Sequence, residues 1–213
     1  MTAYLQFALC ALLGYALGNI QSGLIIGRLM NGADLREHGS GSSGATNALR
    51  VLGRRQAALT FLGDCLKGIA AAGVGLVIAG RHGGMVGGAA AVIGHIWPVF
   101  FGFRGGRGVA TSSGALLLLM PVHVLVMLAV GIPVLLLTKI VSLASLAGAV
   151  TFFVMTVASG VSGGDWFLLA FGVVMAGLVI FAHRANIGRL LNGTEGKISA
   201  SMPGKKRDGK VNP

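Results

Sequence analysis

Apolar runs about as long as a bilayer is thick make up most of this 213-residue chain, and they restrict it to a membrane fold. A bilayer core requires about 20 predominantly apolar residues per straight helix. Hydrophobic residues form 54% of the chain and charged residues only 11%, whereas a soluble domain carries roughly 25% charged residues. We therefore expect one all-α integral membrane domain over residues 1–195, followed by a basic, mobile cytoplasmic tail over residues 196–213.

Six apolar runs are candidates for membrane spans. The first is expected to be a retained span rather than a signal peptide, because no basic stretch precedes it. The longest run could form one span or two short ones. The runs are Tyr4–Ile26, Ala57–Ala79, Gly84–Phe101, Val109–Leu137, Val141–Ser159 and Trp166–Ala182.

The basic residues indicate the topology. Five arginines lie in Gly27–Gln56, Arg104 and Arg107 follow the third span, and seven basic residues follow the last span. The positive-inside rule places these three regions in the cytoplasm. That requires an outside amino terminus, a cytoplasmic carboxyl terminus and an even number of crossings within Val109–Leu137. We predict seven transmembrane helices, of which two are short and meet near Pro121; a re-entrant hairpin would satisfy the same parity.

Three glycine-rich, arginine-bearing segments interrupt the spans, and this topology puts all of them on the cytoplasmic face. They are Gly39–Arg50, Gly105–Thr111 and His183–Glu195. Glycine backbone allows close approach to a ligand, consecutive amides bind anions, and guanidinium groups grip phosphate. Flexible polar linkers and topology-setting arginines would account for the same composition. The candidate substrate- and phosphate-binding residues are Ser40, Gly41, Ser42, Thr46, Asn47, Arg50, Gly106, Arg107, Gly108, Ser142 and Ser145, with His183 and Asn186 as candidate catalytic residues.

A few polar residues lie within the spans. Asp64 and Lys67 are three residues apart and are either functional or simply neutralise each other. His95 is favoured as a packed or helix-bridging histidine. Cys10 and Cys65 are expected to be small core side chains. No acidic or histidine cluster has the spacing of a metal site, so no metal and no cofactor are expected. The basic residues lie beside apolar spans and form no stripe interleaved with aromatic residues. This pattern argues against nucleic acid as a binding partner.

The motifs together resemble one family. The chain is similar to the bacterial acyl-phosphate:glycerol-3-phosphate acyltransferases, the PlsY family, over nearly its whole length. The resemblance rests on the order of several short motifs rather than on any one of them. In this chain they are GNI at Gly18–Ile20, GSGSSGATNALR, GDCLKG at Gly63–Gly68, GHIWPVF at Gly94–Phe100, GGRGVAT, VSLAS at Val141–Ser145 and HRANIGRLLNGTE.

The resemblance implies a multi-pass enzyme of the bacterial inner membrane with its active site on the cytoplasmic face. Such enzymes transfer a fatty acyl group from acyl phosphate to the 1-hydroxyl of glycerol 3-phosphate, giving lysophosphatidic acid and phosphate. It also implies that Ser40, Thr46 and Arg50 lie around the phosphates, and that His183 and Asn186 hold the glycerol hydroxyls. One serine of Val141–Ser145, either Ser142 or Ser145, belongs to the same site.

Two positions depart from the family pattern. Arg107 stands where the family usually has a phosphate-binding lysine, and Ser42 stands where asparagine is expected. Arginine keeps the charge but offers a planar fork in place of a compact ammonium. Both departures affect the geometry of the phosphate site rather than the class of reaction.

The residues favour direct transfer. The chain offers no plausible Ser-His-Asp or Cys-His triad, and phosphate is a good leaving group, so no covalent acyl-enzyme is expected. The proton acceptor is either His183 or the phosphate of the donor. The expected partners are the two substrates and membrane lipid, and the expected state is a monomer. The alternative function is an organic-phosphate or anion transporter, which would also use broken helices and polar turns.

Overall fold

The computed structural model describes residues 2–198, and every regular element in that range is helical. Seven helices contain ten or more residues, and the remaining elements are shorter. In chain order the elements are α1 (Ala3–Gly18), α2 (Ser22–Asn31), η1 (Leu35–Glu37), α3 (Ala45–Val51), α4 (Arg54–Ile96), η2 (Val99–Phe101), α5 (Val109–Leu119), α6 (Pro121–Thr138), α7 (Val141–Gly163), α8 (Trp166–Ala182) and α9 (Arg184–Leu191).

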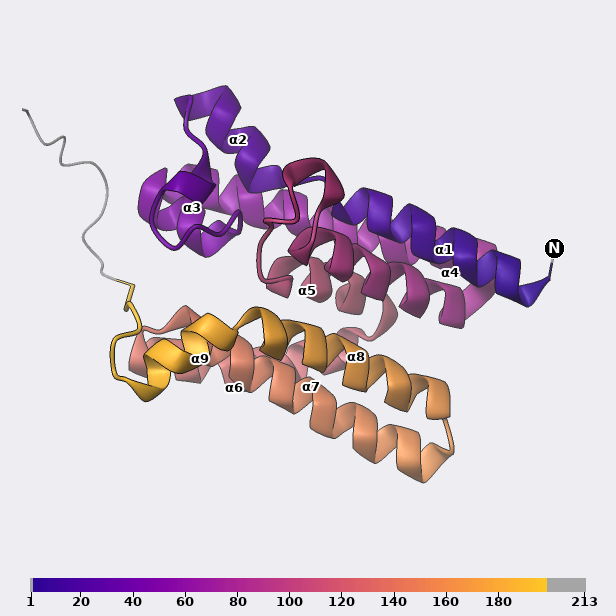
Figure 1. Cartoon of the computed structure of the whole chain (residues 1–213). Coiled ribbons are helices and arrows are strands. Elements are labelled where there is room, and N and C mark those ends of the chain that lie inside the picture. Colours follow the sequence, from indigo (N-terminus) through magenta and orange to yellow (C-terminus); the bar gives the residue numbers. More distant parts are fainter. Residues whose placement is uncertain (1, 199–213) are drawn as a thin grey trace, which may run out of the picture.

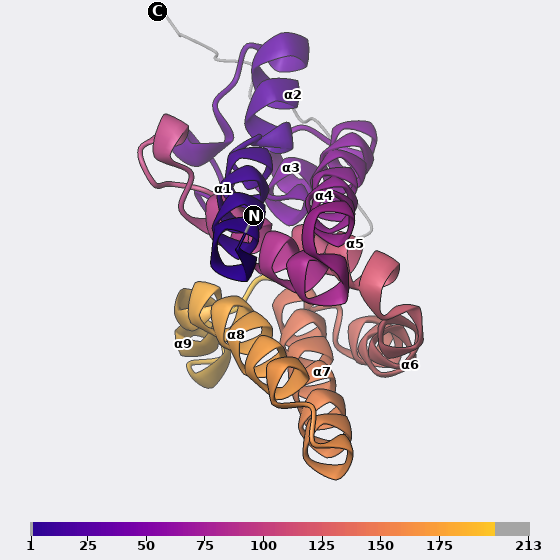
Figure 2. The same cartoon turned by 90° about the vertical axis from the view of Figure 1, so that its right-hand side faces the viewer.

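The helices form two groups that lie side by side (Figure 1). In the first group α1, α2, α3 and α5 all pack on α4. In the second group α7 packs between α6 and α8, and α9 follows α8. The groups meet where α4 contacts α8 and where α5 contacts α6, and Figure 2 shows the same division from the side. Any site between the groups must therefore combine early and late parts of the chain.

The long helix α4 is a hairpin of two helices. Ala79 and Gly80 have non-helical backbone angles, and Gly80 has a φ of 60°. After this turn the chain runs back along itself, so that Gly75 packs on Gly83 and Ala71 packs on Gly87. Small residues let the two backbones approach closely, as is typical of helices packed in membranes.

The bundle has two distinct ends, which we call the site end and the far end. The far end holds the Gly80 turn, where Arg81 pairs with Asp165 at 3.0 Å. The amino-terminal helix starts there too, because Nε2 of Gln6 donates to the carbonyl of Ile78. The site end holds α3, the loop before α5, and α9 (Figure 1).

The expected apolar spans are all found as helices, with two clear errors in their bounds. The run Gly84–Phe101 is helical only to Ile96, because the chain breaks at Trp97 and Pro98 before the short η2. The first run was expected to stay helical to Ile26, but α1 ends at Gly18 and α2 begins at Ser22. The polar residues at this break have buried partners: Asn19 donates to the carbonyl of Tyr15, and Gln21 donates to the carbonyl of His95. The break near Pro121 is as expected, since α5 ends at Leu119 and α6 begins at Pro121.

By length and composition, four candidate spans could cross a membrane, or five if the bent pair α8 and α9 is one span. The α4 hairpin counts as one of the four, and the apolar α5 is shorter than the others. Large apolar side chains such as Leu12, Leu125 and Val173 lie exposed on the outside of the bundle, as a lipid environment requires. The chain is therefore an all-helical protein with several membrane-crossing helices, while the count of seven and the sides of the two termini remain predictions.

Candidate functional site

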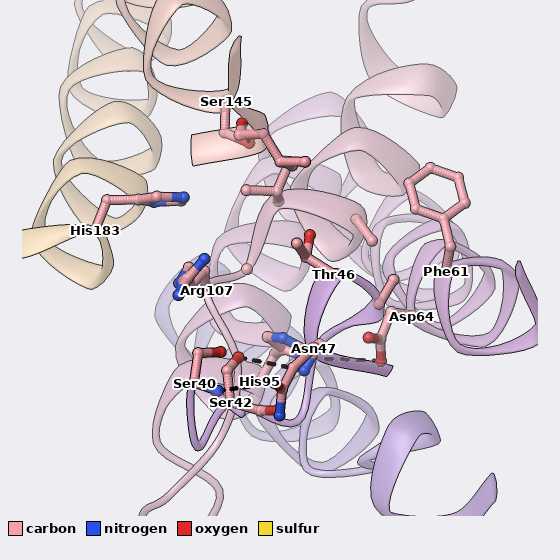
Figure 3. Close-up of a pocket in the computed structure, with 16 residues that line it drawn as sticks. Ser40, Ser42, Thr46, Asn47, Phe61, Asp64, His95, Arg107, Ser145 and His183 are labelled. Atoms are coloured by element: carbon pink, nitrogen blue, oxygen red, sulfur yellow. Dashed lines mark hydrogen bonds and ion pairs between the residues drawn. The ribbon is translucent and has the colours of Figure 1, made fainter. Parts of the chain in front are cut away.

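A cavity of about 130 Å³, which we call the site cavity, lies between the two helix groups at the site end. The first group contributes the loop before α3 and the loop before α5; the second contributes the start of α7 and the end of α8 (Figure 3). Its polar lining residues are Ser40, Ser42, Thr46, Asn47, Asp64, His95, Arg107, Ser145 and His183.

The first loop, residues 39–44, is shaped by a single buried side chain. Oδ1 of Asn47 accepts from the amide of Ser40, and Nδ2 of Asn47 donates to the carbonyls of Leu35, His38 and Ser42 at 2.8–3.0 Å. Gly39 has a φ of 61°, and a Cβ there would collide with Oδ1 of Asn47. The Asn47 amide is thus occupied in holding the loop, and the hydroxyls of Ser40, Ser42 and Thr46 are placed along the cavity.

The second loop, residues 102–108, lies against the first. The amide of Ser43 donates to the carbonyl of Gly105, and the amide of Gly106 donates to the carbonyl of His95. Gly108 has a φ of 78° and stands immediately before α5. This conformation, which favours glycine, lets the chain turn from the loop directly into a helix whose free amides face the site end.

Arg107 is the main charged group of the site cavity. Burial lowers the pKa of its guanidinium to about 10; nearby Glu195 raises it, and Arg189 and Arg50 lower it. The side chain stays positively charged at neutral pH. Because the charge is half-buried and next to other cations, an anion bound there would be strongly favoured.

The third segment begins where α8 ends. Nδ1 of His183 lies 2.8 Å from the carbonyl of Val179, which can only accept, so Nδ1 donates. In the neutral ring Nε2 is then unprotonated and can accept a proton or a hydrogen bond. His183 is only 1% exposed, yet it lines the site cavity.

The rest of this segment is held by one carboxylate. Glu195 accepts from Ser142 at 2.8 Å, from Asn186 at 2.6 Å and from Arg189 at 2.6 Å. Burial raises the pKa of the Glu195 carboxyl, but these three hydrogen bonds outweigh burial and lower it overall. Ser142 and Asn186 are therefore brought together through Glu195, whereas Ser145 lines the cavity itself.

A larger opening of about 380 Å³, which we call the basic cleft, lies next to the site cavity and shares Ser40, Ser42 and Arg107 with it. Gly41, Gly106 and Asn186 line it. Five arginines also line it: Arg36, Arg104, Arg107, Arg184 and Arg189. Two of these are already paired, Arg36 with Asp34 at 2.7 Å and Arg189 with Glu195. Among the described residues, Arg104 and Arg107 have no carboxylate partner, so the cleft presents uncompensated positive charge.

Arg50 lies beside these cavities rather than in their walls. Its Nη2 donates to the carbonyl of Gly196 at 3.2 Å, which ties the first segment to the end of the third. Arg50 is still close enough to lower the pKa of Arg107.

An ionic network lies beneath the two loops. Nζ of Lys67 contacts Oδ1 of Asp64 at 2.9 Å and Nδ1 of His95 at 2.8 Å, and it also donates to the carbonyl of Ile20. All three network side chains are at least 95% buried. The pairing of Asp64 with Lys67 is confirmed. His95 does bridge helices, but Asp64 and His95 also line the site cavity.

A small cavity of about 30 Å³, the apolar cavity, adjoins the site on the membrane side and shares Val109 and Ser145 with it. It lies between α5, α6, α7 and α8, and its walls include Leu116, Met127, Phe152 and Met175. The polar site therefore adjoins an apolar region between the two helix groups.

The structure gathers the predicted site residues at one end of the bundle. Gly108, Ser40, Ser42, Thr46, Asn47, Arg107, Ser145 and His183 line the site cavity, while Gly41, Gly106 and Asn186 line the basic cleft. Sequence reasoning missed Gln21, Ser43 and Glu195 as structural partners. Oγ of Ser43 donates to Oε1 of Gln21 at 2.6 Å. Two sequence signals could have indicated these partners: Gln21 is a polar residue within an apolar run, and Glu195 is the single acidic residue of a basic segment.

The fold and the site define an integral membrane protein with a basic cavity between two helix groups. Comparison of the chain with known proteins supports this class and identifies the family within it. The sequence model described as glycerol-3-phosphate acyltransferase matches residues 8–193. The chain therefore belongs to the glycerol-3-phosphate acyltransferase family, the family of PlsY, and its homologues are acyltransferases.

Curated relatives and solved structures cover most of the chain. A glycerol-3-phosphate acyltransferase of Thermoanaerobacter sp. (strain X514) is 44% identical over 89% of this chain and 94% of its own length. That of Geobacillus kaustophilus (strain HTA426) is 42% identical over 93% and 98%. The crystal structure of PlsY, an integral membrane glycerol 3-phosphate acyltransferase, in its glycerol 3-phosphate form has a TM-score of 0.83 at 37% identity and covers 91% of this chain and 96% of that one. Its lysophosphatidic acid form has a TM-score of 0.79 at 34% identity, covering 91% and 95%.

Proposed function

We propose that this protein transfers a fatty acyl group from acyl phosphate to the 1-hydroxyl of glycerol 3-phosphate. The observation that carries the proposal is the site cavity, in which the two glycine-rich loops and His183 meet beside the apolar cavity between helices. The family and the glycerol 3-phosphate and lysophosphatidic acid forms of PlsY support the acceptor and the product. The acyl phosphate donor rests on the resemblance to the PlsY family, and the anion-binding character of the site is compatible with it.

Two phosphate groups must be bound at once, because donor and acceptor each carry one. The two openings that share Arg107 offer two anion positions. The hydroxyls of Ser40, Ser42 and Thr46, with Arg107, suit one phosphate. Arg104 and the glycines of the second loop suit the other. Arg50 completes the clamp when it leaves the Gly196 carbonyl. Arginine forks bind phosphate through paired charge-assisted hydrogen bonds.

The transfer then needs no protein nucleophile. The acceptor hydroxyl attacks the acyl carbon, the new ester C–O bond forms, and the C–O bond to phosphate breaks. The serines near the reaction are otherwise engaged: Ser145 donates to the carbonyl of Val141, and Ser142 donates to Glu195. Neither is hydrogen-bonded to a histidine in the described part of the chain, as an activated serine would be.

Two groups are candidates to accept the hydroxyl proton. Nε2 of His183 is unprotonated because Nδ1 donates to the carbonyl of Val179. If it takes the proton, His183 is a general base. If an oxygen of the departing phosphate takes it, His183 positions the hydroxyl and the product leaves as hydrogen phosphate. Both routes account for the hydroxyl proton, and both require His183 to lie beside the acceptor hydroxyl.

The acyl chain is expected to lie between the helix groups, along the apolar cavity beside Val109 and Ser145. This route lets the donor stay in the membrane while its phosphate reaches the loops. We place the site on the cytoplasmic face of the bacterial inner membrane, because the basic residues gather at that end. The enzyme is expected to work as a monomer and without a metal ion.

Product formation tests the proposal. Purified protein in lipid nanodiscs, given acyl phosphate and glycerol 3-phosphate, should release lysophosphatidic acid and inorganic phosphate in equal amounts. Acyl-CoA or acyl carrier protein as the effective donor would contradict the donor assignment. A hydroxylamine-sensitive acyl-enzyme would contradict direct transfer. Uptake of glycerol 3-phosphate into vesicles without a donor would favour the transporter instead.

A further inference from the structure

His95 is a buried histidine whose two ring nitrogens have different surroundings. It lies in α4 and is only 3% exposed, yet it lines the site cavity beside Arg107 (Figure 3). Its Nδ1 is 2.8 Å from Nζ of Lys67. Within the described residues, Nε2 takes part in no hydrogen bond. Because His95 lines the site cavity, this nitrogen is free to bond to a ligand there.

Lys67 determines which ring nitrogen carries the proton. An ammonium group has three donors and no acceptor. Lys67 donates to the carbonyl of Ile20, its Nζ lies 2.8 Å from Nδ1 of His95, and it forms an ion pair with Oδ1 of Asp64 at 2.9 Å. Nδ1 of His95 must therefore accept, and in the neutral ring the proton lies on Nε2. His95 thus presents an Nε2–H donor, whereas His183 presents an unprotonated Nε2 to the same cavity.

The protonated nitrogen faces the second loop. A Cβ at Gly106 would collide with Nε2 of His95, so only glycine fits beside this edge of the ring. The carbonyl of His95 also accepts from the amide of Gly106 and from Nε2 of Gln21. The backbone and the ring of His95 therefore both bear on the loop that carries Arg107. Since Asp64 neutralises Lys67, the network supplies a donor without adding net charge.

We propose that His95 is a further substrate-contacting residue, which donates from Nε2 to a phosphate oxygen in the site cavity, with Lys67 and Asp64 as positioning residues that hold its tautomer. The inference rests on the proposed function for the identity of the substrates. The shared chemistry is a phosphate group, and it belongs either to the acyl phosphate or to glycerol 3-phosphate.

Two substitutions separate the ring nitrogens. In His95→Asn the side-chain oxygen can take the place of Nδ1 and accept from Lys67, but no donor remains at the Nε2 position. In His95→Gln the side-chain NH₂ can take the place of Nε2. We expect His95→Asn to raise the KM for one phosphorylated substrate about 10- to 100-fold, the effect of a hydrogen bond to a charged group. We expect His95→Gln to stay within a few-fold of the wild-type protein.

The substrate whose KM rises identifies the phosphate that His95 contacts. Thermal unfolding of both variants should stay close to that of the wild-type protein. Thr156→Val is a matched control, because Thr156 is fully buried and its hydroxyl bonds only within α7. Wild-type kinetics for His95→Asn would overturn the proposal. An equal loss of activity and of thermal stability in both His95 variants would also overturn it, because that is the result of a purely structural role.

A measurement on the wild-type protein needs neither turnover nor a variant. With nitrogen-15 in the histidine rings, we expect one buried ring with protonated Nε2 and unprotonated Nδ1, whose Nε2 signal moves when inorganic phosphate is added. His183 should show the opposite tautomer. A protonated Nδ1 in both buried rings, or no response to phosphate, would contradict the proposal. If the protein formed no lysophosphatidic acid, the proposed function would fail, yet a phosphate-dependent shift would still support this inference.

Discussion

The polar side chains of the site differ in whether the protein already uses their hydrogen-bonding groups. Asn47 and Ser142 are committed to backbone carbonyls and to Glu195. Arg107 and Nε2 of His183 face the site cavity. Substitutions of the first kind should mainly damage the shape of the loops, and substitutions of the second kind should mainly damage binding and transfer.

Arg50→Ala and His183→Ala are expected to lower transfer by at least about 100-fold, the range of a lost acid–base or charge-clamping group. Both proteins should still insert into the membrane, because neither side chain belongs to the apolar core. Steady-state rates and membrane fractions of the two variants provide the measurement. Arg54→Ala is the control, since this neighbouring arginine is exposed and lines neither cavity. Wild-type rates in both variants would refute the site.

Glu195→Gln should make the protein less stable in a pH-dependent way. The pKa of Glu195 is lower in the folded protein than its ordinary value of 4.5, so its contribution is fully present above pH 4.5 and is lost as the pH falls through the lower folded value. At pH 7 the loss should be about 1–3 kcal/mol, because several hydrogen bonds to a charged group are weakened.

Thermal melting of wild-type and Glu195→Gln protein between pH 7 and pH 3.5 measures this effect. The difference between the two melting temperatures should shrink as the pH falls. A difference that stays constant over this range would show that the charge of Glu195 contributes nothing.

At the scale of helices, the packing of α1 on α4 depends on residues without side chains. A Cβ at Gly14 would collide with the carbonyl of Gly87, and a Cβ at Gly18 would collide with the carbonyl of Ala91. These contacts are backbone to backbone, so they cannot be relieved by a rotamer change. The close approach also places the break after Gly18 where Gln21 can reach His95.

Gly14→Ala is therefore expected to lower the melting temperature by several degrees, since overpacking costs about 1–3 kcal/mol. Gly177→Ala in α8 is the matched control, because nothing lies within 4 Å of a Cβ at that position. It should be neutral or slightly stabilising. Equal melting temperatures for the two variants would contradict the tight α1–α4 contact.

The helices were predictable because apolar length and charge are local properties of the sequence. The bounds of α8 and the break near Pro121 follow from such signals. The break between α1 and α2 could not be predicted from local signals. It depends on Gln21, which bonds to the carbonyl of His95, 74 residues away in the chain. The three site segments were found from glycine and arginine content, but the roles of Asn47 and Glu195 depend on tertiary contacts that composition does not reveal. His95 was favoured as a packed or helix-bridging histidine, and its position in the lining of the site cavity was not predicted for the same reason.

At the scale of the whole molecule, the two ends of the bundle should face opposite sides of the membrane. Ser162 is exposed at the far end and Asn192 is exposed at the site end. In a protein with Cys10 and Cys65 replaced by alanine, we expect Ser162→Cys to react with an impermeant maleimide in intact cells. Asn192→Cys should react only after the membrane is permeabilised. The reverse pattern would refute the predicted topology.

The site draws on residues from both helix groups, and the contact between Arg50 and Gly196 spans 146 positions of the chain. Membrane proteins are synthesised from the amino terminus, so the first two loops emerge long before His183. A chain caught midway through insertion would carry the arginines of the first two loops but lack His183 and the rest of the third segment. The ability to make product would then appear only when the last apolar helix has entered the bilayer, which makes acyl transfer itself a reporter of completed biogenesis.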